Sequence, residues 1–312
     1  MRPAFSVVFL TTLIGAGQGL FLALYAAEVF GRLGLAPPPG PRFLNAGSSF
    51  AALLAVLGLV ASFFHLGRPL RAWRSAAKWR TSWLAREVIA LPVFIALVAA
   101  YGLSHRVPLG PPLAIGALAL AACLALFVCT GMIYACIRFL QEWATPLTPV
   151  NFFLIGTASG FTIATALAGT FGPHLAGFFG RWALVLTMFA LASRSLSLVR
   201  NARLKPRSTP QSAIGIAAPR IEQKSQGFMG GSFNTREFFH GMPGGAFVAV
   251  KWGFLLLGFV IPMVLVAAGL AAGSAALLLA APIVQYAGLI GERWFFLAQS
   301  NHPQNLYYRR MA

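Results

Sequence analysis

The sequence predicts an all-α integral membrane protein that is built from eight transmembrane helices. Hydrophobic residues make up 58% of the 312 residues and charged residues only 10%, whereas a soluble protein carries about 25% charged residues. Eight apolar stretches are each long enough to cross the roughly 30 Å hydrocarbon core of a bilayer as a helix. They lie at residues 4–30, 43–66, 83–103, 113–140, 150–171, 177–198, 246–270 and 274–299. We therefore expect residues 1–312 to form a single membrane domain.

Proline and glycine mark the ends of these stretches, because both residues disfavour a continuing helix. Three prolines and a glycine at 37–40 separate the first two stretches, prolines within 108–112 separate the third and fourth, and Gly172 with Pro173 separates the fifth and sixth. A short turn at 269–273 joins the last two. The connection at 199–245 is the only long one and is polar, and we expect it to form a cytoplasmic loop.

The positive charges fall mainly on one side of the predicted bundle. With eight helices both termini lie on the same side, and that side receives 20 of the 24 Lys and Arg residues. Because cytoplasmic loops are enriched in Lys and Arg, we expect both termini in the cytoplasm. The net charge of +18 would suggest a nucleic-acid partner in a soluble protein. In a membrane protein it predicts topology and attraction to anionic lipid instead.

The cysteines and histidines do not form the pattern of a metal site. Cys123, Cys129 and Cys136 share one predicted helix and include no CxxC spacing, so we expect buried thiols rather than Fe–S or zinc ligands. A haem held by two histidines needs a facing pair within the membrane. His65 has no such partner, because the other four histidines fall in predicted loops or tails. We therefore expect no haem or metal in this chain.

Three polar residues are predicted to lie at the same depth on the basic side of the membrane. His65 is near the end of the second stretch, Glu87 near the start of the third and Tyr134 near the end of the fourth, each about one helical turn inside the boundary. A histidine and a carboxylate there can exchange protons with the cytoplasm and bind a carbonyl or hydroxyl group, as quinone chemistry requires. We expect a quinone site at His65 and Glu87, with Gln18, Arg68 and Tyr134 as further contacts.

Each of these candidates also has a purely structural interpretation. His65 can serve as an interface anchor or a helix cap. Glu87 can pair with Arg68 or Arg86, since carboxylates within a membrane usually find a cation. Gln18 can hydrogen-bond a neighbouring helix.

Several long runs of the sequence resemble one family of membrane subunits. The runs at 1–19 (MRPAFSVVFLTTLIGAGQG), 65–73 (HLGRPLRAW), 79–87 (WRTSWLARE), 291–296 (GERWFF) and 302–308 (HPQNLYY) are similar to the dimethyl sulfoxide reductase anchor subunit (DmsC-like) family. The similarity covers nearly the whole chain and is weakest at 199–245.

The resemblance implies eight membrane helices without haem in a bacterial inner membrane. It also implies two partners, a molybdopterin catalytic subunit and a four-cluster Fe–S subunit, and electron exchange with a quinone, either ubiquinone or menaquinone. His65 matches the family's quinol-site histidine at the end of the second helix, and Glu87 matches the glutamate in the following helix.

A docking surface for the Fe–S subunit is a further expectation from the resemblance. The connections after the second and sixth helices carry 15 of the 24 Lys and Arg residues, and tryptophan and arginine are common anchors of buried interfaces. We expect docking at Arg71, Trp73, Arg74, Trp79 and Arg80, unless these loops are basic for reasons of topology alone. A short electron path from the quinone site then requires partners on the cytoplasmic side.

Members of the family serve S- and N-oxide reduction and, in the reverse direction, sulfite oxidation. A cytoplasmic catalytic unit suits intracellular sulfite, so we expect a sulfite:quinone complex, with a menaquinol-oxidising S-oxide reductase as the alternative. Alternatives of other classes are a secondary transporter, which no internal repeat supports, and a purely structural anchor. Glu28 and Glu292 lie near predicted helix ends, and we expect boundary ion pairs there rather than a proton relay.

Overall fold

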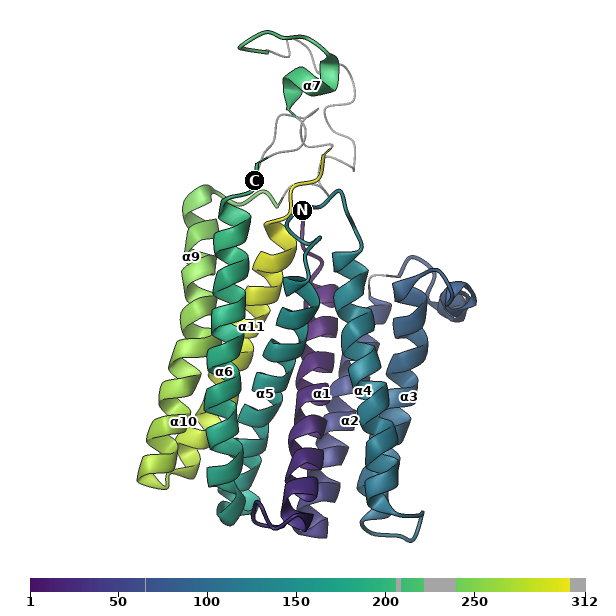
Figure 1. Ribbon diagram of the computed structural model, residues 1–312, viewed down its shortest axis with the longest axis vertical. Helices are drawn as coiled ribbons and strands as arrows, with labels where there is room; N and C mark the ends of the chain where they lie inside the picture. Colours follow the sequence, from purple (N-terminus) through teal and green to yellow (C-terminus); the bar gives the residue numbers. More distant parts are fainter. Residues whose placement is uncertain (65, 206–208, 222–239, 304–312) are drawn as a thin grey trace.

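Eight long helices form a bundle, as the sequence predicts (Figure 1). The computed structural model describes all residues except 65, 206–208, 222–239 and 304–312. Each of the eight crossings is long and apolar enough to span a membrane, and no β-strand occurs in the described part of the chain. The first six are α1 (Phe5–Arg32), α2 (Pro41–Phe63), α3 (Trp83–Ser104), α4 (Pro112–Ala135), α5 (Leu147–Phe171) and α6 (Pro173–Ala202).

The seventh crossing is one continuous rod made of three segments. These are α9 (Gly244–Leu255), a π-helical turn η3 (Leu256–Val260) and α10 (Ile261–Ala272). The eighth crossing is α11 (Ala275–Ala298), and the connection between α6 and α9 contains the short helix α7 (Pro210–Ile214).

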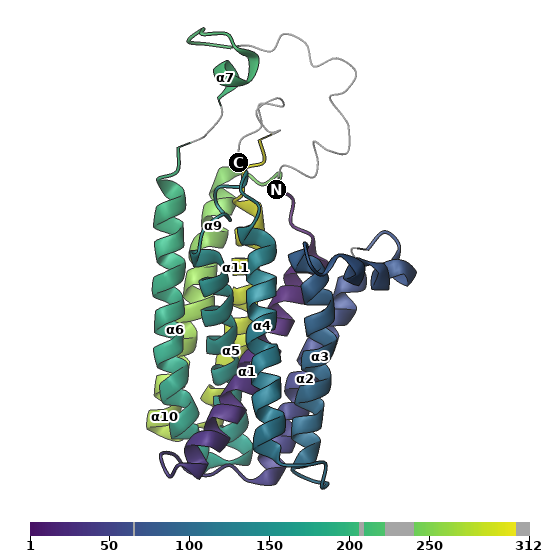
Figure 2. The same cartoon turned by 45° about the vertical axis from the view of Figure 1, so that its right-hand side comes forward.

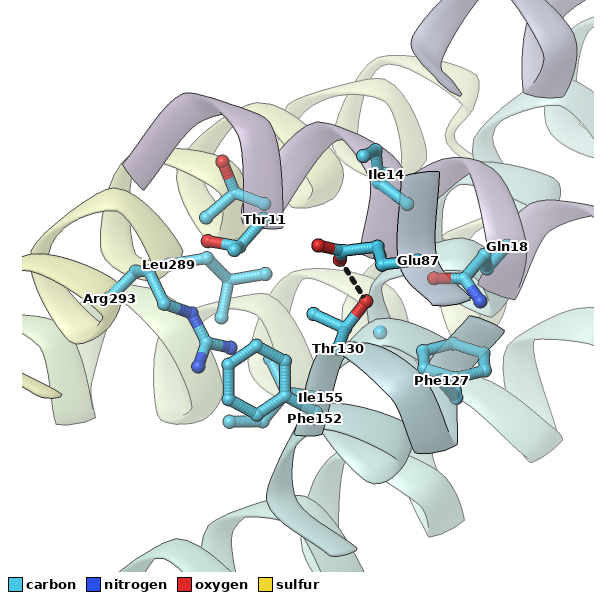
Figure 3. A pocket seen from close by; sticks show the side chains of 13 residues that line it. Thr11, Ile14, Gln18, Glu87, Phe127, Thr130, Phe152, Ile155, Leu289 and Arg293 are labelled. Atoms are coloured by element: carbon cyan, nitrogen blue, oxygen red, sulfur yellow. Dashed lines mark hydrogen bonds between the residues drawn. The ribbon is translucent and has the colours of Figure 1, made fainter. Parts of the chain in front are cut away.

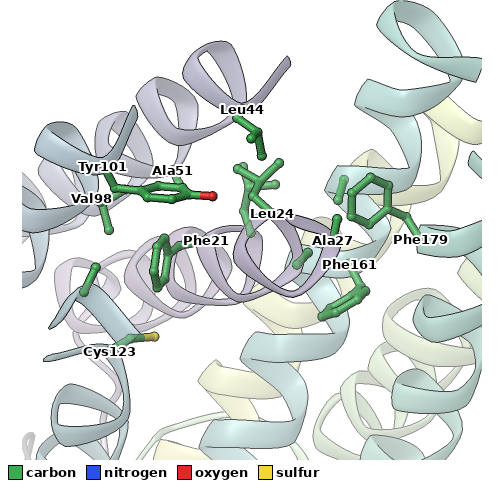
Figure 4. Packing of buried hydrophobic residues seen from close by; sticks show 14 of the residues in the cluster. Phe21, Leu24, Ala27, Leu44, Ala51, Val98, Tyr101, Cys123, Phe161 and Phe179 are labelled. Carbon is green, nitrogen blue, oxygen red and sulfur yellow. The ribbon is translucent and has the colours of Figure 1, made fainter. Parts of the chain in front are cut away.

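The centre of the bundle is formed by α1 and α5. Both are more buried than the remaining crossings, and α1 packs against α2, α4, α5 and α11. Figure 4 shows Phe21 of α1 beside Tyr101 of α3, where the two ring centroids are 5.6 Å apart in an edge-to-face arrangement. Phe161 of α5 and Phe179 of α6 lie on the other side, near Ala27. This apolar core fixes the positions of the helix ends.

Glycine permits the closest approach within the core. A Cβ atom added to Gly19 of α1 would lie 1.9 Å from the carbonyl oxygen of Gly156 of α5. One added to Gly160 would lie 1.8 Å from the carbonyl carbon of Gly19. The two backbones therefore touch, as small residues allow between membrane helices.

The helices define two ends of the bundle (Figures 1 and 2). At the basic end, α2, α4, α6 and α11 finish and α1, α3, α5 and α9 begin. Here the Met1 amine donates to the carbonyl oxygens of Ala298 and Ser300, at 3.1 and 3.0 Å. At the far end, α1, α3, α5 and α10 finish and their successors begin. The assignment of the basic end to the cytoplasm stays a prediction.

At the basic side of the bundle, α2 and α4 finish earlier along the chain than the sequence predicts. α2 ends at Phe63 rather than residue 66, ahead of Gly67 and Pro69, both of which disfavour helix. The next segment, expected to be loop, forms a 3₁₀ helix, η1 (Pro69–Lys78), which projects beside α3 in Figure 2. α4 ends at Ala135 rather than residue 140.

The chain after α4 folds back over the basic end. This segment accounts for the earlier end of α4 and the later end of α6. Trp143 Nε1 donates to the Phe296 carbonyl oxygen of α11 at 2.9 Å, which holds the returning segment against the bundle. Arg200 Nη1 donates to the Gln141 carbonyl oxygen at 3.0 Å. This contact supports the last turn of α6, which runs to Ala202 rather than to the predicted residue 198.

Candidate functional site

A groove opens at the basic end between α2, α3 and η1. Its volume is about 630 Å³, which lies within the usual range for small-molecule sites. Most of its wall is apolar, with Leu59 and Phe63 from α2 and Leu91 from α3. Its polar side chains come from α2, from η1 and its flank, and from α3: Ser62, Arg68, Arg71, Arg74, Ser75 and Glu87.

Glu87 is the buried carboxylate of this groove. Its side chain is 7% exposed, and its Oε1 atom accepts a short hydrogen bond from Thr130 Oγ1 of α4. Among the described residues, no Lys, Arg or His nitrogen lies within 4.0 Å of its oxygens. The structure thus contradicts the interpretation in which Glu87 pairs with Arg68 or Arg86.

Arg86 is occupied by other partners. Its Nε donates to the Trp79 carbonyl oxygen at 2.9 Å and its Nη2 to the Arg80 carbonyl oxygen at 2.8 Å. Its guanidinium carbon also lies 4.3 Å from the centroid of the Trp83 ring. Arg86 therefore closes the connection between η1 and α3, and no described cation pairs with Glu87.

Glu87 also borders a second, inner cavity between α1, α4, α5 and α11 (Figure 3). This cavity has a volume of about 20 Å³, which is enough for a water molecule. Figure 3 shows Glu87, Thr130, Gln18 and Arg293 around it. Glu87 is shared by the linings of the groove and the inner cavity, so its carboxylate stands between a lipid-facing space and a polar interior.

The structure separates the five residues that the sequence suggested as quinone contacts. Arg68 and Glu87 both line the groove. His65 lies outside the described residues. Gln18 lines only the inner cavity, and its Nε2 donates to the Cys123 carbonyl oxygen of α4 at 2.9 Å, which is the helix-to-helix bond of the structural interpretation. Tyr134 borders neither space.

Tyr134 belongs instead to an aromatic cluster near the end of α4. Its ring centroid lies 5.2 Å from that of Trp143, 5.4 Å from that of Phe152 and 5.3 Å from that of Phe296. Phe152 is in α5 and Phe296 in α11. Its ring therefore packs against α5 and α11 rather than at the groove.

The residues that were predicted to dock a partner lie on or beside η1. Arg71, Trp73 and Arg74 also line the groove. Trp73 is 75% exposed and Trp79 is 52% exposed. The Arg80 guanidinium carbon lies 5.5 Å from the Trp79 ring centroid. This segment thus covers the groove with one face and presents tryptophan to its surroundings with another.

The ion pair that the sequence predicted at Glu292 belongs to a charge cluster between α6 and α11, and sequence reasoning missed its two arginines and their burial. Arg194 Nε lies 2.7 Å from Glu292 Oε1, and Arg293 Nη2 lies 3.6 Å from Glu292 Oε2. The charge count had placed both arginines in basic-side connections, but each is 4% exposed or less. Arg293 also lines the inner cavity and lies 3.9 Å from the centroid of the Phe152 ring. The signal that could have revealed it is that Arg194 lies inside the predicted stretch 177–198 and Arg293 inside the predicted stretch 274–299.

The described residues include no group of three or more His, Cys, Asp or Glu side chains that could hold a metal ion. Cys123 and Cys129 are buried, and Cys136 is exposed. The prediction of three buried thiols was therefore wrong for Cys136, which follows the last turn of α4.

A known protein family matches nearly the whole chain, including the groove and the inner cavity. The sequence profile of the DMSO reductase anchor subunit (DmsC) family matches residues 2–296. The chain belongs to this family. The match spans all eight crossings, the groove and the inner cavity, and makes the chain a membrane anchor subunit of an oxidoreductase. It is also 51% identical to a sulfite dehydrogenase subunit of Allochromatium vinosum, over 100% of both chains.

Proposed function

We propose that the chain is the quinone-reactive anchor of a sulfite-oxidising complex that also contains an Fe–S subunit and a molybdopterin subunit. Membership of the DmsC family and the full-length similarity to a sulfite dehydrogenase subunit support the complex and its substrate. The observation that carries the quinone site is Glu87, a buried carboxylate that pairs with no described cation and lies at the wall of a groove. The groove, between the ends of α2 and α3, would take the quinone.

The residues of the groove fit a quinone. Its apolar wall suits an isoprenoid tail, and its polar groups lie together toward η1, where a headgroup would meet them. A bound quinone takes up two electrons and two protons when it is reduced to quinol. Glu87 would hold or release one proton at a headgroup oxygen, and Arg68 would orient the headgroup through its guanidinium donors.

His65 remains our candidate for the opposite side of the headgroup. It lies outside the described residues, but the following residues, Leu66, Gly67 and Arg68, line the groove. An imidazole titrates near neutral pH and is suited to exchange the second proton with the aqueous phase.

We further propose that the basic end faces the cytoplasm and carries the partners. The surface of η1, with Arg71, Trp73, Arg74, Trp79 and Arg80, would contact the Fe–S subunit together with the connection at 199–245. Docking there keeps the distance from an Fe–S cluster to the groove short. Exposure of Trp73 and Trp79 supports this assignment, since tryptophan contributes strongly to protein interfaces.

The direction of electron flow has a second candidate. The family is described by DMSO reductase anchors, and quinol oxidation coupled to S-oxide reduction would use the same groove in reverse. A secondary transporter has no support from the family to which the chain belongs.

Steady-state assays on the purified complex test the proposal. We expect sulfite-dependent reduction of a short-chain quinone, and we expect His65→Ala to abolish it while sulfite-dependent reduction of an artificial dye continues. Quinol-dependent S-oxide reduction without any sulfite activity would show that electrons flow from the quinol to the catalytic subunit instead. An unchanged quinone rate in His65→Ala would remove this residue from the site.

Vesicles of the two orientations test the placement of the partners. Protease added to inverted vesicles should digest the catalytic subunits, and protease added to right-side-out vesicles should leave them intact. Digestion from the periplasmic face alone would contradict the orientation.

A further inference from the structure

A second large cavity lies at the far end of the bundle, away from the groove. It has a volume of about 990 Å³ and lies between the first turn of α2, the end of α3 and the end of α5. Arg42 is in the first turn of α2, and Arg106 follows α3 by two residues. Both arginines line the cavity and both are exposed. The cavity therefore brings two cations together at the depth where a membrane helix meets water.

These two cations differ from the other arginines at the far end. Arg32 pairs with Glu28 at 3.0 Å, and Arg181 Nε donates to the Gly177 carbonyl oxygen at 2.9 Å. The guanidinium groups of Arg42 and Arg106 make no ion pair or hydrogen bond with any described residue. Their guanidinium donors are thus available to an anion from outside the chain.

The first turn of α2 adds further donors. No side chain caps this helix, and Pro41 occupies its first position. The backbone N–H groups of Arg42 and Phe43 therefore lack both an intrahelical acceptor and a side-chain cap. Such a helix start favours a negatively charged group.

The nearest carboxylate does not compete for the two arginines. Glu28 accepts a hydrogen bond from Tyr101 at 2.6 Å, pairs with Arg32, and has His105 Nε2 at 3.6 Å from its Oε2. His105 lies between this network and the cavity: it is close to Glu28, and it also lines the cavity. No described carboxylate therefore pairs with either arginine of the cavity.

The remaining wall of the cavity is apolar. Phe43 and Leu167 contribute to it, together with Phe171, which is 77% exposed at the end of α5. An inorganic anion would use the arginines but would leave these side chains and most of the volume unused. The combination suits a molecule with an anionic head and a hydrocarbon body.

We propose that this cavity binds an anionic phospholipid, with its phosphate on Arg42, Arg106 and the start of α2, and with an acyl chain against Phe43, Leu167 and Phe171. The bound lipid would join α2, α3 and α5 at the far end. The chemistry of recognition is that of a phosphate ester, which a lipid headgroup and free phosphate share. The apolar wall is what favours the lipid. This site does not depend on the proposed quinone chemistry.

Lipid retention by the purified complex tests the proposal. The complex is exchanged into detergent with phosphatidylglycerol or phosphatidylcholine, washed, and analysed by native mass spectrometry. We expect the wild type to retain phosphatidylglycerol and the Arg42→Gln, Arg106→Gln double variant to retain at least about tenfold less, since two charge-assisted contacts are lost. Arg181→Gln is the matched control and should retain the wild-type amount. Equal retention by the double variant, or equal retention of phosphatidylcholine by the wild type, would overturn the proposal.

A second variant separates the lipid from free phosphate. Ala46 lines the cavity on α2 and is exposed, so Ala46→Phe should fill part of the apolar space without altering the arginines. We expect this variant to lose phosphatidylglycerol and to keep its thermal unfolding midpoint in lipid-free detergent. Retention of phosphatidylglycerol by Ala46→Phe would contradict a lipid site. So would arginine-dependent binding of inorganic phosphate alone, in the absence of any lipid retention.

Discussion

Two buried carboxylates lie toward opposite ends of the bundle and have very different surroundings. Glu28, toward the far end, is 5% exposed, and Glu87, toward the basic end, is 7% exposed. Glu28 has a tyrosine hydroxyl, an arginine and a histidine around its two oxygens. Glu87 has one threonine hydroxyl. The two carboxylates are therefore buried to a similar extent, but their described partners compensate the charge of Glu28 more fully than that of Glu87.

The difference indicates which carboxylate is structural and which is free to act on a ligand. Removing a carboxylate from water costs free energy unless cations and hydrogen bonds replace the solvent. Glu28 receives this compensation from the protein, as Glu292 does from Arg194 and Arg293. Glu87 receives no such compensation from the described residues, and it borders a groove from which a ligand or a proton can reach it.

Substitution of Glu87 should give the largest effect. Glu87→Gln removes the titrating group but keeps an oxygen that accepts from Thr130, so the fold should persist. We expect quinone-linked turnover to fall by about 10²–10⁴-fold, the usual contribution of a positioned acid or base, with dye-linked activity unchanged. Glu28→Gln is the control and should keep its quinone-linked rate. A wild-type rate in Glu87→Gln would end the distinction between the two carboxylates.

Loss of Glu292 tests the structural role of a compensated carboxylate. Glu292→Gln leaves Arg194 and Arg293 buried beside each other, and breaking a buried pair in this way costs about 3–5 kcal/mol of stability. Thermal unfolding in detergent should show a lower midpoint. The double variant with Arg194→Met should recover part of the loss, since it removes one of the two uncompensated charges. An unchanged midpoint in Glu292→Gln would mean that the cluster does not stabilise the bundle.

A smaller loss is expected from Tyr101→Phe at the far end. The hydroxyl donates to Glu28 at 2.6 Å, and a hydrogen bond to a charged group contributes about 1.5–3 kcal/mol. Tyr25→Phe is the matched control, because its hydroxyl donates to the neutral Leu113 carbonyl oxygen at 3.1 Å. Chemical unfolding of both variants should rank Tyr101→Phe as the less stable. The reverse ranking would argue against charge compensation of Glu28 by Tyr101.

The smallest effect concerns His105 and pH. Burial lowers the pKa of His105 from its usual value of 6.5, and the Glu28 carboxylate opposes this shift without cancelling it. As the pH falls through 6.5 the unfolded chain takes up the proton first, so stability decreases until the lower folded-state pKa is passed. Unfolding midpoints measured across this range should show the decrease, and His105→Gln should remove it.

Exposed His174 at the start of α6 provides the control for this measurement. His174→Gln should retain the pH dependence of the wild type. If it abolishes the dependence while His105→Gln does not, the assignment to His105 is wrong.

The sequence predicted the eight crossings well, because apolar length is a local property of the chain. It also singled out Glu87, since a carboxylate inside an apolar stretch is conspicuous, and the role of Glu87 at a quinone stays a prediction. It could not show the partners of Glu87 among the described residues, because these depend on Thr130 from another helix and on Arg86 having turned toward the carbonyl oxygens of Trp79 and Arg80.

The errors arose where rotation about a helix axis decides the outcome. Tyr134 lies near the end of α4, but α4 is apolar on nearly all sides and offers no amphipathic cue to the direction in which Tyr134 points. Arg194 and Arg293 were assigned to loops because a charge count treats every arginine near a span end alike. Only the packing of α6 against α11 shows that both are inside.

The glycine contact between α1 and α5 has a consequence for biosynthesis. α1 is translated first, yet the surface that matches Gly19 belongs to a helix made four crossings later. Until α5 enters the bilayer, α1, one of the two most buried helices of the finished protein, remains open along that face. A ribosome that stalls after α4 therefore leaves a fragment without its central partner. If the chain is instead divided between α6 and α9, α1 and α5 remain together in the N-terminal fragment.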